Sequence, residues 1–496
     1  MYYARMSLNR LILLLLTISL TGCMVGPNYH RQPAPLIWKY NSKHLPNKTV
    51  ATPGTGKAGV AQQYVNNEDI PAEWWKLFHS EAINSLVTTG ISNSPNIGAA
   101  YAALRQAQEN YYTQIGNTLL PAFDLGGTAQ RQLFNASGFG GEIPSSIFNL
   151  FNVSVNVSYT LDVFGGARRL VEAFGAQVDY QQFQLIGAYL TMTANIVTTS
   201  IAIASVQAQI EATEFLIREA ESQLKVLRGQ YRLGGISLAN VASQEALVGQ
   251  TRATLPPLQL LLSQNRHALS VLVGEYPGGP LPAIRLSQLT LPKNIPISLP
   301  SNMVRQRPDV RASEALLHAA SAQVGVATAN LLPQFPITGA YGWQAGVPSR
   351  LFSTQSNLWN IAAGVTQPLF HGGALLSQRR ASIDAYQQAL MQYKQTVLQA
   401  VQNVADSLRA LETDARTLRA QKEAERAAYT NLRLTENQYR LGGVSFINLL
   451  TAEQQYQQAK ISLIQAEAAR YADTAALFQS LGGGWWHKEW CVKQCF

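Results

Sequence analysis

Alternating apolar and polar residues predict four β-strands in this chain. In NVSVNVSYTLDV at 152–163, apolar side chains occupy every second position and polar side chains the positions between them. A period of two is typical of a strand with one apolar face. The same alternation predicts strands at about 335–345 and 357–370. A weaker one is predicted at about 121–133, where Arg131 interrupts the apolar face.

Each predicted strand is long enough to cross a membrane, because a tilted membrane-spanning strand needs about ten residues. The same alternation occurs in half-buried strands of ordinary antiparallel sheets, so the pattern alone leaves both interpretations open. The leader segment and the long helices favour the membrane interpretation. The polar positions of the clearest strand would then suit a water-filled interior: Asn152, Ser154, Asn156, Ser158 and Thr160.

Two very long helices are predicted, because no proline occurs at 167–232 or at 374–440. At 1.5 Å per residue each would be about 100 Å long, far beyond the usual three or four turns. Apolar residues in both recur at alternating spacings of three and four, the pattern of a coiled-coil seam. Shorter helices are predicted before them, at about 95–118 and 308–331, and after them, at about 236–274 and 444–482. A short amphipathic helix is predicted at 73–87.

The chain contains two copies of one unit. QYRLGGISLANVASQE at 230–245 returns as QYRLGGVSFINLLTAE at 438–453, and DVFGGARR at 162–169 corresponds to PLFHGGALLSQRR at 368–380. Each copy runs through a helix, two strands, a long helix, a turn and a return helix. The glycines predict tight turns, because glycine adopts backbone conformations that other residues resist. We assign the first repeat to 71–275, a linker to 276–306, the second repeat to 307–484 and a tail to 485–496.

The N-terminus resembles a bacterial lipoprotein signal. Arginines precede LILLLLTISL at 11–20, which is too short to span a bilayer as a helix, and LTGC follows at 20–23. We therefore expect a signal peptide at 1–22, cleavage before Cys23 and acyl chains, palmitate among them, on Cys23. A secretory signal with an incidental cysteine is the alternative. Met24 after the cysteine favours the outer membrane of a Gram-negative bacterium, and proline-rich 23–70 is predicted to be a lipidated tether.

Composition excludes several functions. The net charge of +9 is modest for 496 residues, and basic residues do not alternate with aromatic ones, so no nucleic-acid partner is expected. The histidines lack metal-ligand spacing, and GGISLAN and GGVSFIN lack the lysine and the spacing of a phosphate-binding loop. We predict no catalysis, no metal site and no cofactor besides the lipid on Cys23.

The remaining cysteines and the tandem arginines each allow two interpretations. Cys491 and Cys495 are four residues apart, which on a helix separates their Cα atoms by about 6 Å, within disulfide range. They form a disulfide or stay two free thiols. The pairs at 168–169 and 379–380 flank the inner rim of a barrel or begin solvated helices.

Four strands cannot close a barrel, and open strand edges are not tolerated in lipid. Several copies must therefore share one barrel. Two copies would supply eight strands, with an interior filled by side chains, and three would supply twelve, which is wide enough for a lumen.

Several ordered motifs over residues 20–484 resemble outer membrane efflux proteins, most of all the TolC-like lipoproteins of the OprM and NodT type. These motifs are LTGCMVGPNYHRQP, EWWKLF, RPDVRASEALLHAASAQVGVA, LFHGG and the paired YRLGG turns. The resemblance implies a membrane α+β fold: a homotrimer whose twelve-stranded β-barrel continues into a coiled-coil α-helical barrel in the periplasm, with the linker at 276–306 in an equatorial belt.

The resemblance also implies function, partners and sites. Such proteins are the outer-membrane exit ducts of tripartite efflux systems. They passively conduct small toxic compounds from an inner-membrane pump of the resistance–nodulation–division class, through a periplasmic adaptor, and so contribute to multidrug resistance. The adaptor would dock on the two turns, at Leu233, Gly234, Gly235, Leu441, Gly442 and Gly443.

By the same resemblance, the periplasmic end is closed just after the second turn. Ile447 falls where an apolar constriction ring is common, although ordinary coiled-coil packing would also explain it. Asn448 and Thr451 occupy positions that are commonly acidic, so this chain lacks the usual carboxylate ring, and Glu453 is a weak substitute for it. Two alternatives remain: a duct of this architecture for type I protein secretion, and a periplasmic coiled-coil scaffold that never enters the membrane.

Overall fold

The computed structural model describes residues 24–33, 40, 46–66, 68–134, 145–297 and 304–487. The predicted lipid attachment at Cys23 and the thiols of Cys491 and Cys495 fall outside these ranges and stay predictions. The chain divides into two compact units. The sheet unit comprises residues 1–32, 102–182 and 312–394, and the hairpin unit comprises 33–101, 183–311 and 395–496. Each unit is described by itself.

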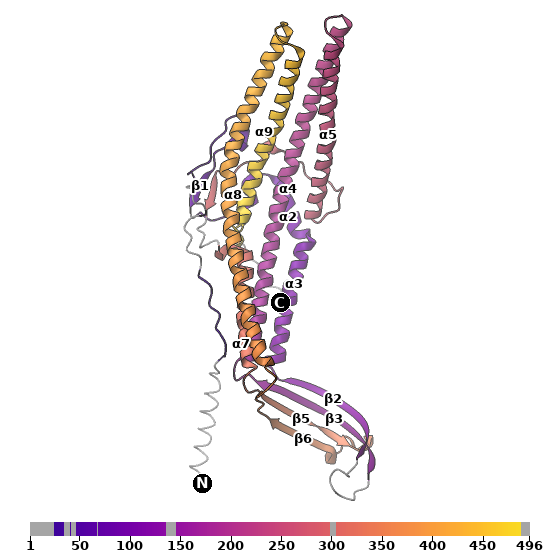
Figure 1. The fold of residues 1–496 in the computed structure, drawn as a ribbon. Coiled ribbons are helices and arrows are strands. Elements are labelled where there is room, and N and C mark those ends of the chain that lie inside the picture. Colours follow the sequence, from indigo (N-terminus) through magenta and orange to yellow (C-terminus); the bar gives the residue numbers. More distant parts are fainter. Residues whose placement is uncertain are drawn as a thin grey trace. The chain divides into compact units, whose positions relative to one another are not determined.

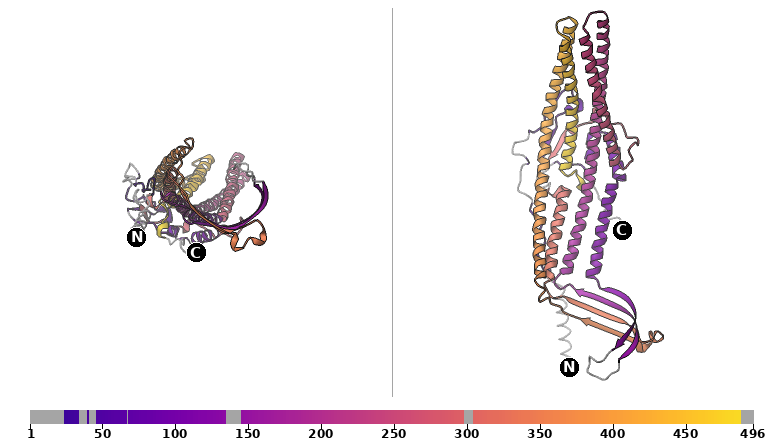
Figure 2. Two further views of the ribbon diagram at one scale, coloured as in Figure 1. Left: turned by 90° about the horizontal axis from the view of Figure 1, so that it is seen from below. Right: turned by 45° about the vertical axis from the view of Figure 1, so that its right-hand side comes forward.

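The sheet unit contains one curved antiparallel sheet with the strand order β2-β3-β5-β6 (Figures 1 and 2). Its strands are β2 (Ala122–Phe134), β3 (Ser146–Leu161), β5 (Phe335–Ala345) and β6 (Asn357–Ala363). β5 has the predicted bounds, whereas β3 begins six residues before the predicted start at 152. The sequence alternation therefore identified the strands that pair.

Apolar side chains gather on one face of this sheet. The pairing register places two rows of directly opposite residues across all four strands, Phe123–Val157–Gly339–Ile361 and Leu125–Val155–Tyr341–Trp359. Leu125 is 77% exposed and Trp359 is 69% exposed, so this apolar face is open. The row between them, Asp124–Asn156–Ala340–Asn360, points to the other face because side chains alternate along a strand.

The predicted strand at 357–370 is too long, because β6 ends at Ala363. Its neighbour β5 has Pro336 at the next register position, and proline has no N–H to donate to the ladder. Gly364 N–H still donates to the Pro336 carbonyl at 2.9 Å, and Thr366 and Gln334 then form an isolated bridge. The pairing of this segment with β5 therefore continues in the same register beyond Ala363, but the ladder of hydrogen bonds is interrupted at Pro336.

Helices make up most of the remaining chain. The α-helices are α2 (Glu81–Asn93), α3 (Pro95–Leu119), α4 (Gly166–Arg232), α5 (Leu238–Leu272), α7 (Pro308–Ala329), α8 (Ala374–Arg440) and α9 (Phe446–Ser480). Helices α4 and α8 have 67 residues each, and the return helices α5 and α9 have 35 each. These equal lengths match the sequence repeat, and α3 and α7 each begin at a proline, where its missing N–H costs nothing.

The predicted coiled-coil seams are buried in the hairpin unit. Along α4 the buried positions include Val206, Ile210 and Leu227, and along α8 they include Val404, Leu408, Leu411, Ala415 and Leu418. Figure 1 shows α4 running beside α5 and α8 beside α9. An 18-residue window of α4 has a mean hydropathy of 1.4, enough for a membrane span by composition, but 61% of it is buried within the protein. That burial is typical of a core helix.

The prediction of one helix at 73–87 is wrong. A 3-10 helix (Trp74–Phe78) is separated from α2 by His79, whose φ is +51°. Ser80 then caps α2 by accepting from the Ile83 N–H. The break directs Trp74, Trp75 and Phe78 into the core, where Trp74 stacks on Phe478 of α9.

Residues 46–66 are partly ordered by distant partners. Strand β1 (Gln63–Asn66) pairs in parallel with β4 (Asn294–Ile297), from the predicted linker. Arg470 of α9 is fully buried and donates to the carbonyls of Ala58 and Val60 and to the Gln62 side chain. The sequence pattern predicted no strand or helix in this part of the tether. The segment is held in place by residues that are distant in sequence, which a local pattern does not reveal.

The start of the tether packs on the sheet unit. Val25 N–H donates to the Phe164 carbonyl at 3.0 Å, just beyond the end of β3. The buried Arg169 donates to Val25 O and to Asn28 Oδ1, and forms an ion pair with Glu172 at 2.7 Å. The inner-rim interpretation of the tandem arginines stays a prediction, but a solvated helix start does not apply to the buried Arg169. It holds the N-terminal segment against the beginning of α4.

Candidate functional site

The two turns between the long and return helices have the same backbone structure. In the first turn, Gly234 N–H donates to Tyr231 O at 2.9 Å and Gly235 N–H donates to Gln230 O at 2.9 Å. This bond pair is a Schellman motif, which satisfies the last carbonyls of a helix. The second turn repeats it with Gly442 and Gly443, and the φ angles of Gly234 and Gly442 are +73° and +74°. Glycine is needed at both positions because L-residues rarely adopt this conformation.

The turns present apolar side chains to solvent. Leu233 and Leu441 are each 88% exposed, directly before the left-handed glycines. An ideal Cβ built on Gly234 or Gly442 would meet no atom within 4 Å. These glycines therefore serve backbone conformation rather than close packing, and the leucines are the exposed apolar groups of the turns.

The residues assigned to the gate share one open face at the start of α9. Ile447, Asn448 and Thr451 are exposed, whereas Phe446, Leu449 and Leu450 are buried. The Thr451 hydroxyl donates to the Ile447 carbonyl at 2.8 Å, so its hydrogen bond stays within the helix. The open face is neutral. It can narrow a passage by bulk and by apolar contact, but it holds no charge.

The ends of the two hairpins share one apolar core. Buried residues of α4 and α5, including Leu227 and Val248, pack in one cluster with Phe446 and Leu449 of α9 and with Leu432 of α8. Burial of each large side chain stabilises such a core by about 1.5–3 kcal/mol. The hairpin ends are therefore a single packed body in this state, and the gate face is held by that body.

Polar side chains also join the hairpins. Gln465 Nε2 donates to Gln209 Oε1 at 3.1 Å, and the Thr251 hydroxyl donates to Gln457 Oε1 at 3.4 Å. Nearer the turn, Glu453 is half-buried beside Gln244 of α5, whose side chain favours the ionised carboxyl and lowers its pKa. Burial raises the pKa of the Glu453 carboxyl to about 7, with a further rise from the charge of Glu436. Glu453 therefore does not lie on the exposed gate face and cannot substitute for a carboxylate ring there.

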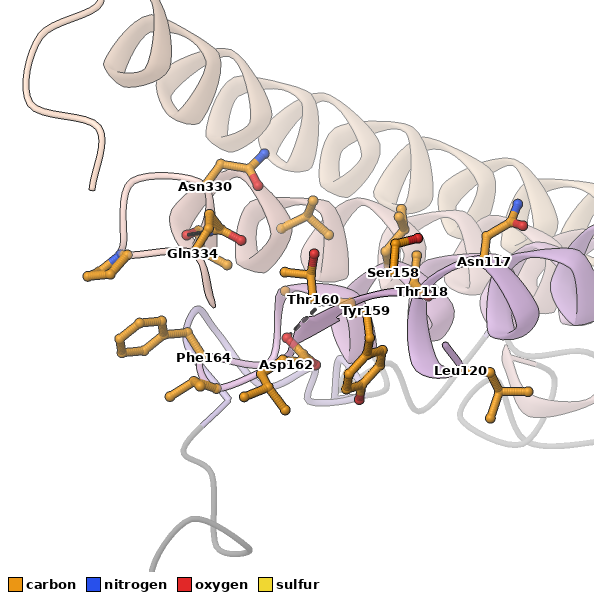
Figure 3. A pocket seen from close by; sticks show the side chains of 18 of the residues that line it. Asn117, Thr118, Leu120, Ser158, Tyr159, Thr160, Asp162, Phe164, Asn330 and Gln334 are labelled. Carbon is orange, nitrogen blue, oxygen red and sulfur yellow. Dashed lines mark hydrogen bonds between the residues drawn. The ribbon is translucent and has the colours of Figure 1, made fainter. Parts of the chain in front are cut away.

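A cavity of about 350 Å³ lies in the sheet unit where β3 ends and α4 begins (Figure 3). Its lining is mixed: apolar side chains such as Leu161, Phe164 and Leu170 lie beside uncharged polar ones, namely Asn117, Thr118, Ser158, Tyr159, Thr160, Asn330 and Gln334. The carboxylate of Asp162 accepts from the backbone N–H groups of Ala167 and Arg168 and from Arg168 Nε. Because these donors already use the carboxylate, the cavity does not provide a free general base.

Within the described ranges, no group of three or more His, Cys, Asp or Glu side chains could hold a metal ion. The structure adds residues that the sequence reasoning did not single out, chiefly Gln244, Glu436 and Arg470. The repeat could have drawn attention to Glu436, because Arg228 in the first copy is replaced by this glutamate at the corresponding position 208 residues later.

Comparisons with known proteins agree with this architecture. A family model described as outer membrane efflux protein matches residues 86–275 and 299–483. The pyoverdine export outer membrane protein OpmQ of Pseudomonas aeruginosa is 26% identical over 422 residues, covering 83% of this chain and 87% of OpmQ. The toluene efflux pump outer membrane protein TtgC of Pseudomonas putida is 26% identical over 478 residues, covering 95% of this chain and 94% of TtgC.

Among solved structures, the outer-membrane channel OprN superposes with a TM-score of 0.83 at 24% identity, over 93% of this chain and 100% of that chain. This likeness shows a shared fold.

Proposed function

The chain belongs to the outer membrane efflux protein family, and on this premise we propose that it is the outer-membrane exit duct of a tripartite efflux system. Three copies would form a twelve-stranded barrel in the outer membrane and a helical barrel in the periplasm. The duct is passive and performs no catalysis. Small toxic compounds would reach it from an inner-membrane pump of the resistance–nodulation–division class through a periplasmic adaptor.

The sheet is the observation that carries this proposal. One of its faces bears exposed apolar rows, the other bears polar side chains, and its outer strands β2 and β6 each have one neighbour among the described residues. An open sheet edge is not tolerated in lipid, so β2 and β6 would pair between copies. Twelve strands would leave a lumen lined by the polar face.

The hairpin ends support the periplasmic part of the proposal. The exposed Leu233 and Leu441 would contact the adaptor, held in place by the Schellman turns. Ile447, Asn448 and Thr451 would meet their counterparts from the other copies and form an uncharged constriction. Apolar bulk, rather than carboxylates bridged by cations, would then close the passage.

Lipid attachment at Cys23 fits the contacts of the first described residues. Val25, two residues after this cysteine, is hydrogen-bonded to Phe164 at the end of β3. Acyl chains on Cys23 would therefore enter the membrane beside the sheet, because only Met24 separates Cys23 from Val25. The named exports of two relatives, pyoverdine and toluene, favour small molecules as the transported class.

Deletion of the gene tests this function. Cells that lack the protein should accumulate compounds from a toxic panel, and the intact gene should restore export. The membrane fraction should also yield a trimer whose electrophoretic migration changes on heating. Unchanged accumulation with loss of a secreted protein would indicate type I secretion instead. Full release of a folded protein from membranes by carbonate would indicate a periplasmic scaffold.

A further inference from the structure

A groove of about 660 Å³ lies in the hairpin unit, between the return helices α5 and α9 and beside α4. No charged residue is among the described residues that line it. The lining joins threonines and apolar side chains such as Leu216, Leu247 and Ile461 to six glutamines: Gln209, Gln250, Gln454, Gln457, Gln458 and Gln465. We call it the glutamine groove. Its volume is within the range of small-molecule sites, about 300–1,000 Å³.

The floor of the glutamine groove is fixed by hydrogen bonds. Gln209 and Thr251 are buried, and they are joined to Gln465 and Gln457 of the other hairpin. Gln209 Nε2 also donates to Ser205 Oγ at 3.2 Å. The polar groups of the floor are therefore already used by the protein.

The rim of the groove has more freedom. Gln250 of α5 and Gln454 of α9 are exposed, so their amides can turn toward a bound molecule. A primary amide supplies both donors and an acceptor. The rim can therefore match carbonyl, amide and hydroxyl groups alike.

Two consecutive prolines add a backbone acceptor to the groove. Pro256 and Pro257 lie inside α5, and neither has an N–H group. The carbonyl of Ala253, a residue that lines the groove, therefore receives no bond from the residues three and four positions later. The corresponding positions of the second repeat are Ile464 and Gln465, which keep their N–H groups. Only the first hairpin has this free acceptor.

The α9 wall of the groove continues the gate face. Along α9, spacings of four and three residues, which place side chains on one face of a helix, connect Ile447, Thr451, Gln454, Gln458, Ile461 and Gln465. The first two belong to the gate face and the other four line the groove. At 1.5 Å per residue, Gln458 lies about 16 Å along the helix from Ile447. If the gate face looks into the passage, the groove does as well.

From this continuity we propose that the glutamine groove is a binding site inside the passage for transported molecules. Its ligands are uncharged amphipathic compounds that combine an apolar ring or chain with carbonyl, amide or hydroxyl groups. The site deepens the proposed function and rests on it. Binding there is weak, because a conduit must release what enters it.

The absence of charge in the lining sets the ligand class. An ionised compound would lose hydration in the groove without gaining a counter-ion. Arg252 is next to the lining residue Ala253, but it already forms an ion pair with Glu221. An uncharged compound loses less hydration and gains from contact with Leu216, Leu247 and Ile461.

Two probes that differ by one carboxylate test this selectivity. Chloramphenicol is uncharged and joins an aromatic ring to an amide and two hydroxyl groups, whereas its succinate ester is an anion. Saturation-transfer NMR with the protein in lipid nanodiscs, after subtraction of empty nanodiscs, measures the binding of each. The wild type should bind chloramphenicol several-fold tighter than the ester, equally at pH 6 and pH 8.

Two variants locate the binding in the groove. Gln454→Lys should tighten the ester several-fold, and its control is Gln455→Lys, the same change at an exposed neighbour that does not line the groove. Ala253→Trp, at an exposed position, should fill the groove and weaken chloramphenicol at least several-fold. Its control is Ala246→Trp, at an exposed position of α5 away from the lining. Both controls should bind as the wild type does.

Equal binding of the two probes by the wild type, or chloramphenicol binding that survives Ala253→Trp, overturns the site. Planar bilayers test its place in the passage: chloramphenicol should interrupt the wild-type current briefly, and Ala253→Trp should make these interruptions several-fold rarer. A current unaffected by a probe that binds would remove the groove from the passage. Because the groove lies within one copy of the chain, the binding assay needs no conducting trimer. Selective binding together with unchanged accumulation in cells that lack the gene would contradict the exit-duct function and leave the groove standing.

Discussion

Tyr29 stacks on His318, with the ring centroids 4.4 Å apart and the ring planes inclined by 18°. His318 in turn lies 2.8 Å from Glu172, the ion-pair partner of the buried Arg169. This stack joins the start of the tether to helix α7. The tether therefore begins as a packed part of the sheet unit.

Tyr29→Ala should free the segment 24–33. Loss of the stacked ring should cost about 2 kcal/mol of folding free energy and expose this segment to protease. Tyr29→Phe should be neutral or slightly stabilising, because the Tyr29 hydroxyl is buried without a partner among the described residues. Tyr276→Ala, at a side chain that is 91% exposed, is the control. Equal protease sensitivity of Tyr29→Ala and the control would contradict the role of the stack.

Gly442→Ala should destabilise the second turn by about 1 kcal/mol, because an L-residue at its φ of +74° is strained. Gly443→Ala should have a smaller effect. Its φ is not in the left-handed region, and an added Cβ would lie an ordinary 3.5 Å from the Gln438 carbonyl. Hydrogen exchange at the turn amides measures the difference. Equal effects of the two substitutions would argue against the Schellman geometry as the reason for glycine.

Arg470→Ala should lower stability by at least about 3 kcal/mol, because it leaves several buried acceptors of residues 58–62 without a donor. Arg470→Lys should rescue only part of this loss, because lysine lacks the planar fork of donors. Thermal unfolding in detergent measures both, with Arg416→Ala, at an exposed ion pair, as the control. Full rescue by lysine would show that charge alone matters.

Asp414→Asn should flatten the pH dependence of stability. Burial, followed by the hydrogen bond and charge of Asp473, raises the pKa of Asp414 to about 7. The folded state therefore binds this proton more tightly, and the stability it contributes at low pH is lost as pH rises from 3.8 to about 7. The variant should unfold a few degrees above the wild type at pH 8 and near it at pH 5. Asp384→Asn, at an exposed residue, should leave the wild-type profile unchanged.

Asn448→Asp combined with Thr451→Asp should make the closed state sensitive to divalent cations. Both side chains lie on the exposed face of α9 with Ile447, and a trimer would gather six new carboxylates, which are ligands that Mg²⁺ and Ca²⁺ prefer. Millimolar Mg²⁺ should reduce the conductance of the double variant several-fold and leave the wild type unaffected. Asn437→Asp, at an exposed position of α8, is the control. Inhibition of the wild type by Mg²⁺ would place other carboxylates in the passage.

Much of the fold could be predicted because its signals are local. The proline-free stretch at 167–232 became α4 at Gly166–Arg232, and the alternation at 335–345 became β5 with the same bounds. Predictions failed where the deciding partner is distant. β6 ends early because of Pro336 on its neighbour, and the helix at 73–87 breaks at His79, where burial of the tryptophans sets the geometry.

The candidate site shows the same limit. The sequence by itself determined the two glycine turns and the neutral residue types at the predicted gate, because these depend on residue type and local backbone, whereas the exposure of Leu233 and Leu441 came from the structure. It could not separate Glu245 from Glu453, which occupy the same position of the repeat. Only the tertiary structure decided that one lies in solvent beside Arg228 and the other is half-buried beside Gln244. The reason is physical: the proton affinity of a carboxyl group depends on its burial and on nearby charges, which packing between distant helices sets.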